Sequence, residues 1–319
     1  MSQAFEHRPV MTDEVVALVR PVPPGVLVDA TVGGGGHARA LLGAHPHLRL
    51  VGIDRDEDAL AAAGEALAGF GERVVALHHA RFDRMADVVA IAGTAGAKGS
   101  TAGSVSAVLF DLGVSSPQLD RAERGFSYRL DAPLDMRMDR STGRTAADLV
   151  NAATAQELAR LIARSGEHRF AGRIARRIVE RRPLTTTTEL AEVVRDAIPA
   201  AARRTGGHPA RRVFQAVRIA VNDELDVLAP ALDTAVDLLV PGGRCVVLAY
   251  HSGEDRIVKE RFAHAASGGC ECPPTLPCAC GAVPLVRLLT RGAAKPSPTE
   301  VEANRRAESA RLRACERLA

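Results

Sequence analysis

Short apolar runs that alternate with helix-compatible stretches place the strongest constraint on the fold of this chain. Four such runs end in or just before Gly, Asp or His and are separated by Ala-rich stretches: Val26–Asp29, Leu48–Asp54, Val74–Leu77 and Val105–Leu112. Strands that are buried on both faces have this composition, and parallel strands need a crossover that is usually helical. The first 112 residues therefore predict a doubly wound α/β domain with a parallel sheet.

The pattern becomes helical after Gly125. No run typical of a buried strand occurs between residues 125 and 221, whereas Thr154 with Glu157 and Thr186 with Glu189 form capping boxes that predict helix starts. A further helix is expected from Glu167 to Arg182, ended by Pro183, with an apolar and a basic face. The two faces are expected to hold Phe170, Ile174 and Ile178, and Arg169, Arg173, Arg177 and Arg181.

The alternation of helix and strand resumes after Leu225. The sequence predicts a helix at 231–239, a turn at 241–243, a strand at 245–250, and a helix that Ser252 and Asp255 open. Two more strands are expected at 285–290 and 310–315. We therefore predict a sheet domain made of residues 1–124 and 222–319, interrupted by a helical insertion of residues 125–221.

The formal net charge of +3 conceals a basic middle segment. Residues 121–221 hold 20 arginines, no lysine and 11 acidic residues, a local balance of +9 that leaves −6 for the rest. Clustered guanidinium groups suit phosphate, which they bind bidentately, although many charge runs only keep a helical surface solvated. Composition leaves both interpretations open. Intrinsic disorder is excluded, because 46% of the residues are hydrophobic and can form a core.

Targeting signals are not evident in the sequence. The N-terminal residues lack the basic and apolar regions of a signal peptide, and no stretch approaches the roughly 18 unbroken apolar residues of a spanning helix. The expectation is a soluble, cytoplasmic protein without a membrane partner. Whether it forms a homo-oligomer stays open.

Four of the six cysteines crowd into one loop, as Cys270, Cys272, Cys278 and Cys280. In a reducing compartment such a loop indicates bound metal or free thiols before disulfides. Four thiolates could hold zinc tetrahedrally, but C-x-x-C spacing is the stronger zinc signal and this loop has C-x-C. Zinc and reduced thiols therefore both remain open, with reduced thiols preferred.

The first strand leads into a glycine-rich loop, D-A-T-V-G-G-G-G-H, at residues 29–37. Consecutive glycines let the backbone approach a ligand closely, with a helix N-terminus nearby. Gly33, Gly35 and Ala38 fit the dinucleotide fingerprint G-x-G-x-x-A, and Asp54 ends the second strand where it can bind ribose hydroxyls. The loop is also similar to the S-adenosylmethionine loop D-x-G-x-G-x-G. By itself it does not decide between the two cofactors.

A group of polar residues follows the fourth strand, at the edge where open α/β sheets bind ligands. It comprises a carboxylate, two hydroxyls, a proline and an amide: Asp111, Ser115, Ser116, Pro117 and Gln118. Methylating an exocyclic amine requires the nitrogen lone pair to face the methyl carbon, and oxygen acceptors that hold the amine hydrogens can position it. We expect Ser115, Ser116 and Pro117 to hold the amine. An ordinary polar turn is the alternative.

Three long runs make the interpretation specific. They are DLGVSSPQLDRAERGFSYRLDAPLDMRMD at 111–139, FQAVRIAVNDEL at 214–225 and HSGEDRIVK at 251–259. Together with HRPVMTDEVV near the N-terminus and the glycine loop, they resemble the MraW family, also called RsmH, of 16S ribosomal RNA cytosine N4-methyltransferases. The resemblance covers nearly the whole chain. It implies a class I S-adenosylmethionine-dependent domain with a helical insertion, acting on a cytosine in the decoding centre of the small ribosomal subunit.

The resemblance also implies which residues contact the cofactor: Gly35, Gly36, His37, Asp54, Phe82, Asp111 and Gln118. Without it, Phe82 would be read as a core residue and His37 as a surface histidine. Asp111 would receive either the methionine amino group or the target amine. The chain departs from the family pattern at Tyr250, where Phe is common, and at Gly253, where Leu is usual, so we expect a small repacking there.

Two other classes of protein share some of these features. A nicotinamide-dependent dehydrogenase would use the same glycine loop and Asp54. A non-catalytic RNA-binding module would need only the arginine-rich surface, but it leaves the residues from Asp111 to Gln118 unexplained.

Overall fold

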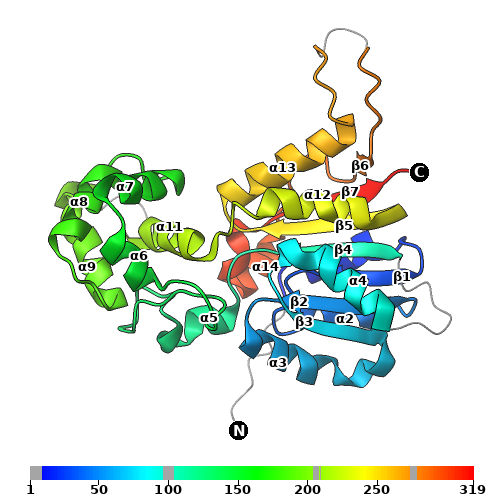
Figure 1. The fold of residues 1–319 in the computed structure, drawn as a ribbon, viewed down its shortest axis with the longest axis horizontal. Helices are drawn as coiled ribbons and strands as arrows, with labels where there is room; N and C mark the ends of the chain where they lie inside the picture. Colours follow the sequence, from blue (N-terminus) through cyan, green and yellow to red (C-terminus); the bar gives the residue numbers. More distant parts are fainter. Residues whose placement is uncertain (1–8, 96–103, 204–207, 209, 274–278) are drawn as a thin grey trace. The chain divides into compact units, whose positions relative to one another are not determined.

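The computed structural model describes residues 9–95, 104–203, 208, 210–273 and 279–319. The chain divides into two compact units (Figure 1): Met1–Gly113 with Val227–Ala319, and Val114–Asp226. We call the first the sheet unit and the second the helical unit. These limits lie outside the sequence-based limits of 125 and 221.

The sheet unit contains a seven-stranded sheet in the order β3-β2-β1-β4-β5-β7-β6. The strands are β1 (Gly25–Asp29), β2 (Leu48–Asp54), β3 (Val74–His79), β4 (Val105–Asp111), β5 (Leu239–Ala249), β6 (Val286–Leu288) and β7 (Arg311–Arg317). Strands β1 to β5 pair in parallel, and β7 pairs antiparallel with both β5 and β6. This is the class I, Rossmann-like fold, so the predicted fold class is confirmed.

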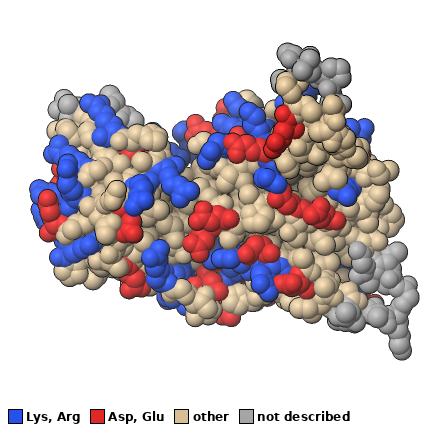
Figure 2. Space-filling view, turned by 45° about the horizontal axis from the view of Figure 1, so that its top comes forward, with Lys and Arg blue, Asp and Glu red and all other residues tan. Residues whose placement is uncertain are grey.

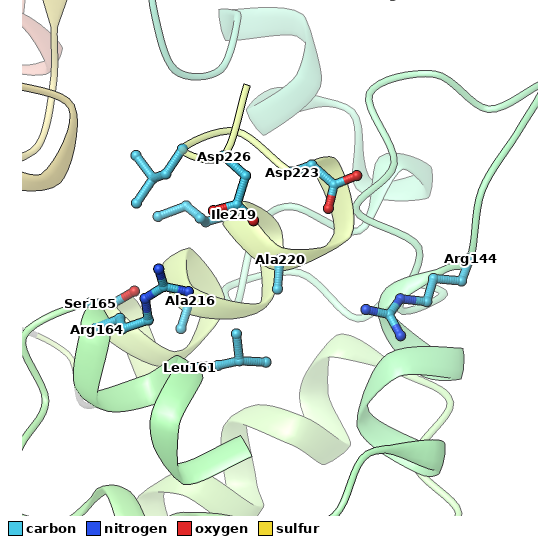
Figure 3. Close-up of a pocket in the computed structure, with 10 residues that line it drawn as sticks. Arg144, Leu161, Arg164, Ser165, Ala216, Ile219, Ala220, Asp223 and Asp226 are labelled. Atoms are coloured by element: carbon cyan, nitrogen blue, oxygen red, sulfur yellow. The ribbon is translucent and has the colours of Figure 1, made fainter. Parts of the chain in front are cut away.

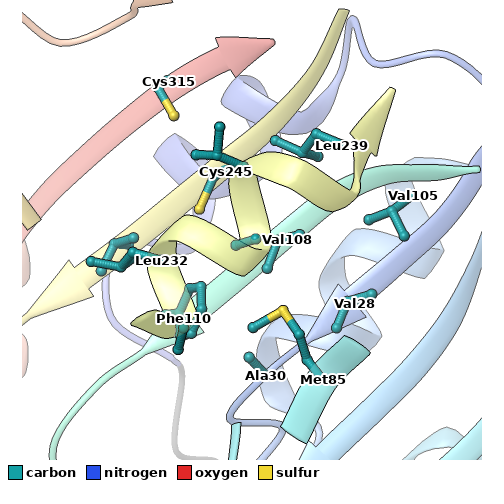
Figure 4. Close-up of a cluster of buried hydrophobic side chains, with 14 of the residues drawn as sticks. Val28, Ala30, Met85, Val105, Val108, Phe110, Leu232, Leu239, Cys245 and Cys315 are labelled. Atoms are coloured by element: carbon teal, nitrogen blue, oxygen red, sulfur yellow. The ribbon is translucent and has the colours of Figure 1, made fainter. Parts of the chain in front are cut away.

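Helices cover both faces of this sheet. They are α1 (Thr12–Val19), α2 (Gly36–Ala44), α3 (Glu57–Leu67), α4 (Met85–Ala95), α12 (Leu228–Leu238), α13 (Ser252–Ser267) and α14 (Pro298–Ala303), with 3-10 turns η1 (Ala68–Arg73), η2 (Phe82–Arg84) and η4 (Arg305–Ser309). Apolar residues of α4, α12 and α13 form one core cluster with the sheet, and those of α1, α2 and α3 form another. Leu27 and Val28 of β1 enter opposite clusters, because successive side chains of a strand alternate. Figure 4 shows the first cluster, where Phe110, Met85 and Leu232 are fully buried.

The expected turn at 241–243 is instead an irregular part of a longer strand. Val105 of β4 pairs with Leu239, and Ala107 pairs with Arg244, so β5 places extra residues opposite Ser106. Gly242 has a φ of +79°, in the left-handed region that favours glycine. The proline and glycines therefore form a bulge, which local turn propensity does not distinguish from a chain reversal.

Other boundaries also differ from the expectations. The predicted strands at 285–290 and 310–315 are observed as β6 and β7, and α12 begins at Leu228 rather than Ala231. The cap of α13 is His251 with Glu254, rather than Ser252 with Asp255. Asp255 instead forms an ion pair with Arg313 of β7, at 2.7 Å between Oδ1 and Nε.

The helical unit contains α5 (Ser116–Asp120), η3 (Ala122–Arg124), α6 (Ala146–Ala152), α7 (Ala155–Arg164), α8 (Ala171–Glu180), α9 (Thr187–Ala197), α10 (Ala200–Arg203) and α11 (Ala210–Asn222). The capping boxes at Thr154 and Thr186 are confirmed. The helix α8 is shorter than expected, so Arg169 and Arg181 lie outside it. Ile174 and Ile178 are fully buried in a core that belongs to this unit alone. No helix in the described ranges is long and apolar enough to cross a membrane.

Candidate active site

The loop between β1 and α2 is folded back against the end of β2. Gly33 and Gly35 have φ values of +52° and +79°, a conformation that other residues rarely adopt. The N–H of Val32 donates to the carbonyl of Ile53 at 2.9 Å, and the N–H of Gly33 donates to Oδ2 of Asp54 at 2.8 Å. The glycine loop is therefore fixed beside Asp54. The sequence predicts this proximity, because it assigns the loop and Asp54 to one cofactor site.

Gly36 has a role that the sequence did not reveal. A Cβ at this position would lie 2.5 Å from Cγ of Pro9, so the absence of a side chain makes room for the N-terminal segment. The next residue, His37, is 5% exposed, and its Nε2 lies 2.9 Å from the carbonyl oxygen of Val10. The segment before α1 thus packs directly on the first turn of α2.

His37 also contacts the end of β4. Its Nδ1 lies 3.3 Å from Oδ2 of Asp111. A carbonyl oxygen can only accept, so Nε2 carries the proton shared with Val10, and Nδ1 is satisfied beside a carboxylate only if it is protonated as well. Burial alone lowers the pKa of His37, but the hydrogen bond and charge of Asp111 outweigh burial, and the pKa is raised. Both contacts of the ring therefore favour the imidazolium form of His37.

Tyr250 is a functional-site residue that sequence reasoning missed. Its hydroxyl donates to Oδ1 of Asp111 at 2.7 Å, whereas the sequence predicted only a small repacking at this departure from the family pattern. Burial raises the pKa of Tyr250 well above its usual value, and the Asp111 charge adds to this, so the hydroxyl keeps its proton. The backbone N–H of Asp111 also donates to Oγ1 of Thr31 at 2.6 Å. Asp111 is therefore held from three directions, and its side chain remains 28% exposed.

Asp29, at the end of β1, is a buried carboxyl group of this site with a strongly raised pKa. It is 1% exposed, and burial raises its pKa to about 7 against the opposing effects of the His37 charge and the Thr31 N–H. Its Oδ1 accepts from that N–H at 3.3 Å. The acid of the D-x-G-x-G-x-G pattern is therefore a buried group that titrates near neutrality.

Asp54 ends β2 with both carboxyl oxygens in use. In addition to Oδ2 with Gly33, Oδ1 accepts from the N–H of Asp56 at 2.9 Å. Burial raises the pKa of this carboxyl, and these N–H groups act in the opposite direction. The backbone N–H of Arg55 also acts on this carboxyl. A carboxylate offers about four lone-pair positions, so at least one remains to receive a ribose hydroxyl.

Phe82 lies in η2, just after β3. Its ring meets the ring of Phe110 edge-on, with centroids 5.7 Å apart, and it packs at the border of the first core cluster while remaining partly exposed. Core packing and cofactor contact, the two interpretations of Phe82 from the sequence, are therefore both compatible with the structure, because the side chain contacts the core and is partly exposed.

The remaining predicted residues begin the helical unit. Ser115 caps α5: its Oγ accepts from the N–H of Gln118 at 3.4 Å, and Oε1 of Gln118 accepts from the N–H of Ser115 at 3.0 Å. Ser116 and Pro117 form the first turn of this helix, with Pro117 exposed and Gln118 buried. Gln118 therefore has a structural role, because its side chain closes the turn that contains residues 115–117.

A cavity of about 170 Å³ lies within the helical unit (Figure 3). Arg144 and Arg164 line it from different segments, and Asp223 and Asp226 line it near the end of α11. Apolar residues that include Leu161 and Ile219 complete the wall. The two arginines and the two aspartates balance in charge, so the cavity by itself does not select an anion.

Arginine side chains are spread over the surface of the helical unit, with acidic side chains among them (Figure 2). On α8, Arg173, Arg176 and Arg177 are exposed, and Arg177 pairs with Glu180 at 2.8 Å. The guanidinium of Arg169, just before this helix, lies 5.0 Å from the Phe170 ring centroid. These arginine side chains of the helical unit therefore lie at its surface.

The strand order, the glycine loop beside Asp54 and the anchored carboxylate at the end of β4 define a class I methyltransferase. The family model described as the MraW methylase family matches residues 4–318, and this chain belongs to that family.

Two curated relatives agree with this membership. A protein of Mycobacterium sp. (strain KMS) named ribosomal RNA small subunit methyltransferase H is 53% identical over 99% of this chain and 85% of its own length. A protein of the same name from Heliobacterium modesticaldum is 50% identical over 98% of this chain and 99% of its own length. A solved rRNA methylase from Streptococcus thermophilus aligns with 99% of this chain and 100% of its own at 12% identity, with a TM-score of 0.41.

Proposed function

We propose that this protein transfers a methyl group from S-adenosylmethionine to N4 of a cytosine in the decoding centre of 16S ribosomal RNA. The observation that carries the proposal is membership of the MraW methylase family over residues 4–318. Relatives named for methylation of small-subunit ribosomal RNA support the choice of substrate. The choice of N4 and of the decoding centre rests on the resemblance of the three long runs at 111–139, 214–225 and 251–259.

The residues of the sheet unit fit S-adenosylmethionine. Asp54 has at least one lone-pair position left for a ribose hydroxyl, and Phe82 is partly exposed, so its ring can stack on the adenine. Asp111 is a partly exposed carboxylate that would receive the methionine amino group or the target amine. The glycine loop from Gly33 to Gly36 places backbone N–H groups at the start of α2. His37 would act through Asp111, because both of its ring nitrogens already have partners within the protein.

When bound, S-adenosylmethionine supplies the methyl carbon, which bonds to the amine nitrogen while its bond to sulfur breaks and the amine loses one proton. The residues at 115–117 would position the nucleophile. Hydroxyl and carbonyl oxygens there would accept the amine hydrogens and direct the nitrogen lone pair, and rigid placement contributes much of the rate. The capping box of Ser115 and Gln118 gives this segment a defined backbone.

The helical unit would hold the RNA. Exposed arginines of α8 offer sequence-independent contacts to phosphate. The target base would be extruded from its stack so that its amine can be reached. Under this proposal, residues 125–221 are the RNA-binding domain, and residues 1–124 and 222–319 are the methyltransferase domain.

Membership of a methylase family favours methyl transfer over the two alternatives. A dehydrogenase would require nicotinamide binding at the glycine loop, and calorimetry with S-adenosylmethionine and with NAD separates the two. A non-catalytic RNA-binding module would incorporate no methyl group.

The deciding experiment combines a deletion strain with nucleoside mass spectrometry. We expect 16S RNA from a strain deleted for this gene to lack one N4-methylcytosine, and the wild-type gene to restore it. Asp111→Ala should not restore it, whereas Asp237→Ala, which changes an exposed carboxylate of α12, should. Purified enzyme should incorporate labelled methyl groups into small subunits from the deletion strain. Unchanged RNA methylation after deletion would refute the assignment, and loss of a different modification would refute the choice of N4.

A further inference from the structure

The described cysteines of this chain fall into two groups with opposite environments. Cys245 and Cys315 are fully buried in the sheet, as is usual for free thiols that pack like small apolar groups. Burial raises the pKa of Cys245 well above its usual value and that of Cys315 to about 12. Cys270 and Cys272 are only partly buried, and Cys280 is exposed. Core packing does not explain why these three are cysteines.

The three accessible thiols lie together. The sulfur atoms of Cys270, Cys272 and Cys280 are all within 4.8 Å of one another, although Cys280 comes from the opposite side of the loop. Cys278, the fourth cysteine of the loop, lies outside the described residues.

These thiols sit on an arm between α13 and β6. Figure 1 shows its two described stretches, in orange, beyond the end of α13. At the base, the N–H of Leu285 donates to the carbonyl of Ala265 at 2.9 Å, and a Cβ on Gly268 would lie 2.3 Å from the carbonyl oxygen of Val283. No helix or strand is assigned to the described residues 268–273 and 279–285. Val283 is 71% exposed, so this arm has little core to order it.

We propose that Cys270, Cys272 and Cys280 bind one Zn²⁺ ion that joins the two described stretches of the arm. Thiolates bind zinc at about 2.3 Å, which sets neighbouring sulfurs about 3.8 Å apart in a tetrahedral site, so closure requires shifts of about an ångström. Three converging sulfurs supply most of a structural zinc shell, and coordination to zinc would order a segment that lacks a core. The sequence left zinc and reduced thiols open, with reduced thiols preferred. We favour zinc because the structure brings thiols of both C-x-C segments together.

Metal analysis of the full-length chain, purified with reductant and without added metal, tests the proposal. We expect about one zinc per chain in the wild type. Cys272→Ser and Cys280→Ser should each weaken zinc binding at least about 100-fold in competition with a chromogenic chelator. Ser267→Ala, at the end of α13 before the arm, removes no thiol and should leave zinc binding unchanged.

Spectroscopy provides a second readout that does not depend on activity. Co²⁺ in place of zinc should give thiolate-to-cobalt charge-transfer bands in the wild type and in Ser267→Ala, and much weaker bands in the Cys→Ser variants. Circular dichroism of each variant checks that the sheet unit is folded. Absence of metal together with absence of Co²⁺ bands overturns the proposal, as does stoichiometric copper or iron in place of zinc. Zinc binding that survives loss of Cys272 and of Cys280 would overturn the assigned ligands.

Discussion

Asp111 owes its position to two side chains that arrive from different elements. His37 at the start of α2 and Tyr250 at the end of β5 contact its two carboxyl oxygens at 3.3 and 2.7 Å. A hydrogen bond to a charged group contributes about 1.5–3 kcal/mol, more than a neutral one. These contacts orient the carboxylate before any ligand arrives.

Tyr250→Phe isolates one of these contacts, because the ring is kept and only the hydroxyl is removed. We expect the free energy of unfolding to fall by about 1.5–3 kcal/mol at pH 7, as measured by urea denaturation. The matched control is Tyr128→Phe, which removes a hydroxyl in the helical unit while keeping the ring that stacks on His208 at 4.5 Å. Equal stabilities of the two variants would show that the contact with Asp111 contributes nothing.

Asp29 makes stability depend on pH. Its pKa is about 7 in the folded protein and about 3.9 in an unfolded chain, so between these values the folded state binds the extra proton. Stability therefore falls as pH rises through this window. His37 acts in the same direction: because its folded pKa is raised, its contribution is complete below an unfolded pKa of about 6.5 and is lost as pH passes the folded value.

Asp29→Asn should reduce the loss of folding stability that accompanies rising pH. The amide cannot ionise, and its oxygen can still accept from the Thr31 N–H. Relative to the wild type, the variant should gain roughly 1–4 kcal/mol between pH 5 and pH 8. Thermal unfolding at several pH values measures the difference, with Asp237→Asn, at an exposed position of α12, as the control. A slope identical to the wild type would contradict a raised pKa at Asp29.

At the scale of elements, the start of α13 is organised by a buried carboxylate. Glu254 is 2% exposed, and its Oε2 accepts from the N–H groups of Tyr250 and His251 at 2.8 and 3.1 Å. Nδ1 of His251 accepts in turn from the N–H of Gly253 at 3.1 Å. This reciprocal cap fixes the chain where β5 delivers Tyr250 to Asp111.

Glu254→Ala should therefore destabilise the sheet unit by about 2–4 kcal/mol, because it leaves two backbone donors without their acceptor. Glu260→Ala, on an exposed position of the same helix, should change stability by less than about 0.5 kcal/mol. Ser252→Ala should be equally mild, since Ser252 is exposed and His251 is the cap. A large effect of Ser252→Ala with a small effect of Glu254→Ala would restore the sequence-based capping box.

At the scale of the molecule, the proposed division of labour predicts how RNA binding depends on salt. The slope of log affinity against log salt becomes shallower by about 0.7–0.9 for each RNA phosphate that the protein no longer neutralises. Replacing Arg173 and Arg176 of α8 with Ala should therefore lower the slope by about 1.4–1.8 and weaken binding without regard to sequence.

A second double variant distinguishes the effect of where the charges are lost from the effect of the change in net charge. Replacing Arg256 and Lys259, both exposed on α13, with Ala removes the same charge from the sheet unit and should leave the slope almost unchanged. Titrations of a 16S RNA fragment at several salt concentrations provide the measurement. Equal decreases of the slope in the two double variants would mean that only the total charge matters.

The sequence by itself determined the parallel sheet, the helical middle segment and the starts of α7 and α9. These follow from local signals, namely apolar runs and capping residues such as Thr154 and Thr186, which act within a few residues. It also located the glycine loop, Asp54 and Asp111, because the carboxyl ends of parallel strands share one edge.

Only the tertiary structure decided how these residues are held. Tyr250 and Asp111 are 139 residues apart in the chain, and Thr31 and Asp111 are 80 apart. The bulge at Pro241–Gly243, the packing of Pro9 on Gly36 and the meeting of Cys272 with Cys280 likewise depend on neighbours that local sequence does not specify. Hydrophobic periodicity selects elements, whereas directional contacts between polar groups exist only after packing has brought distant segments within bonding distance.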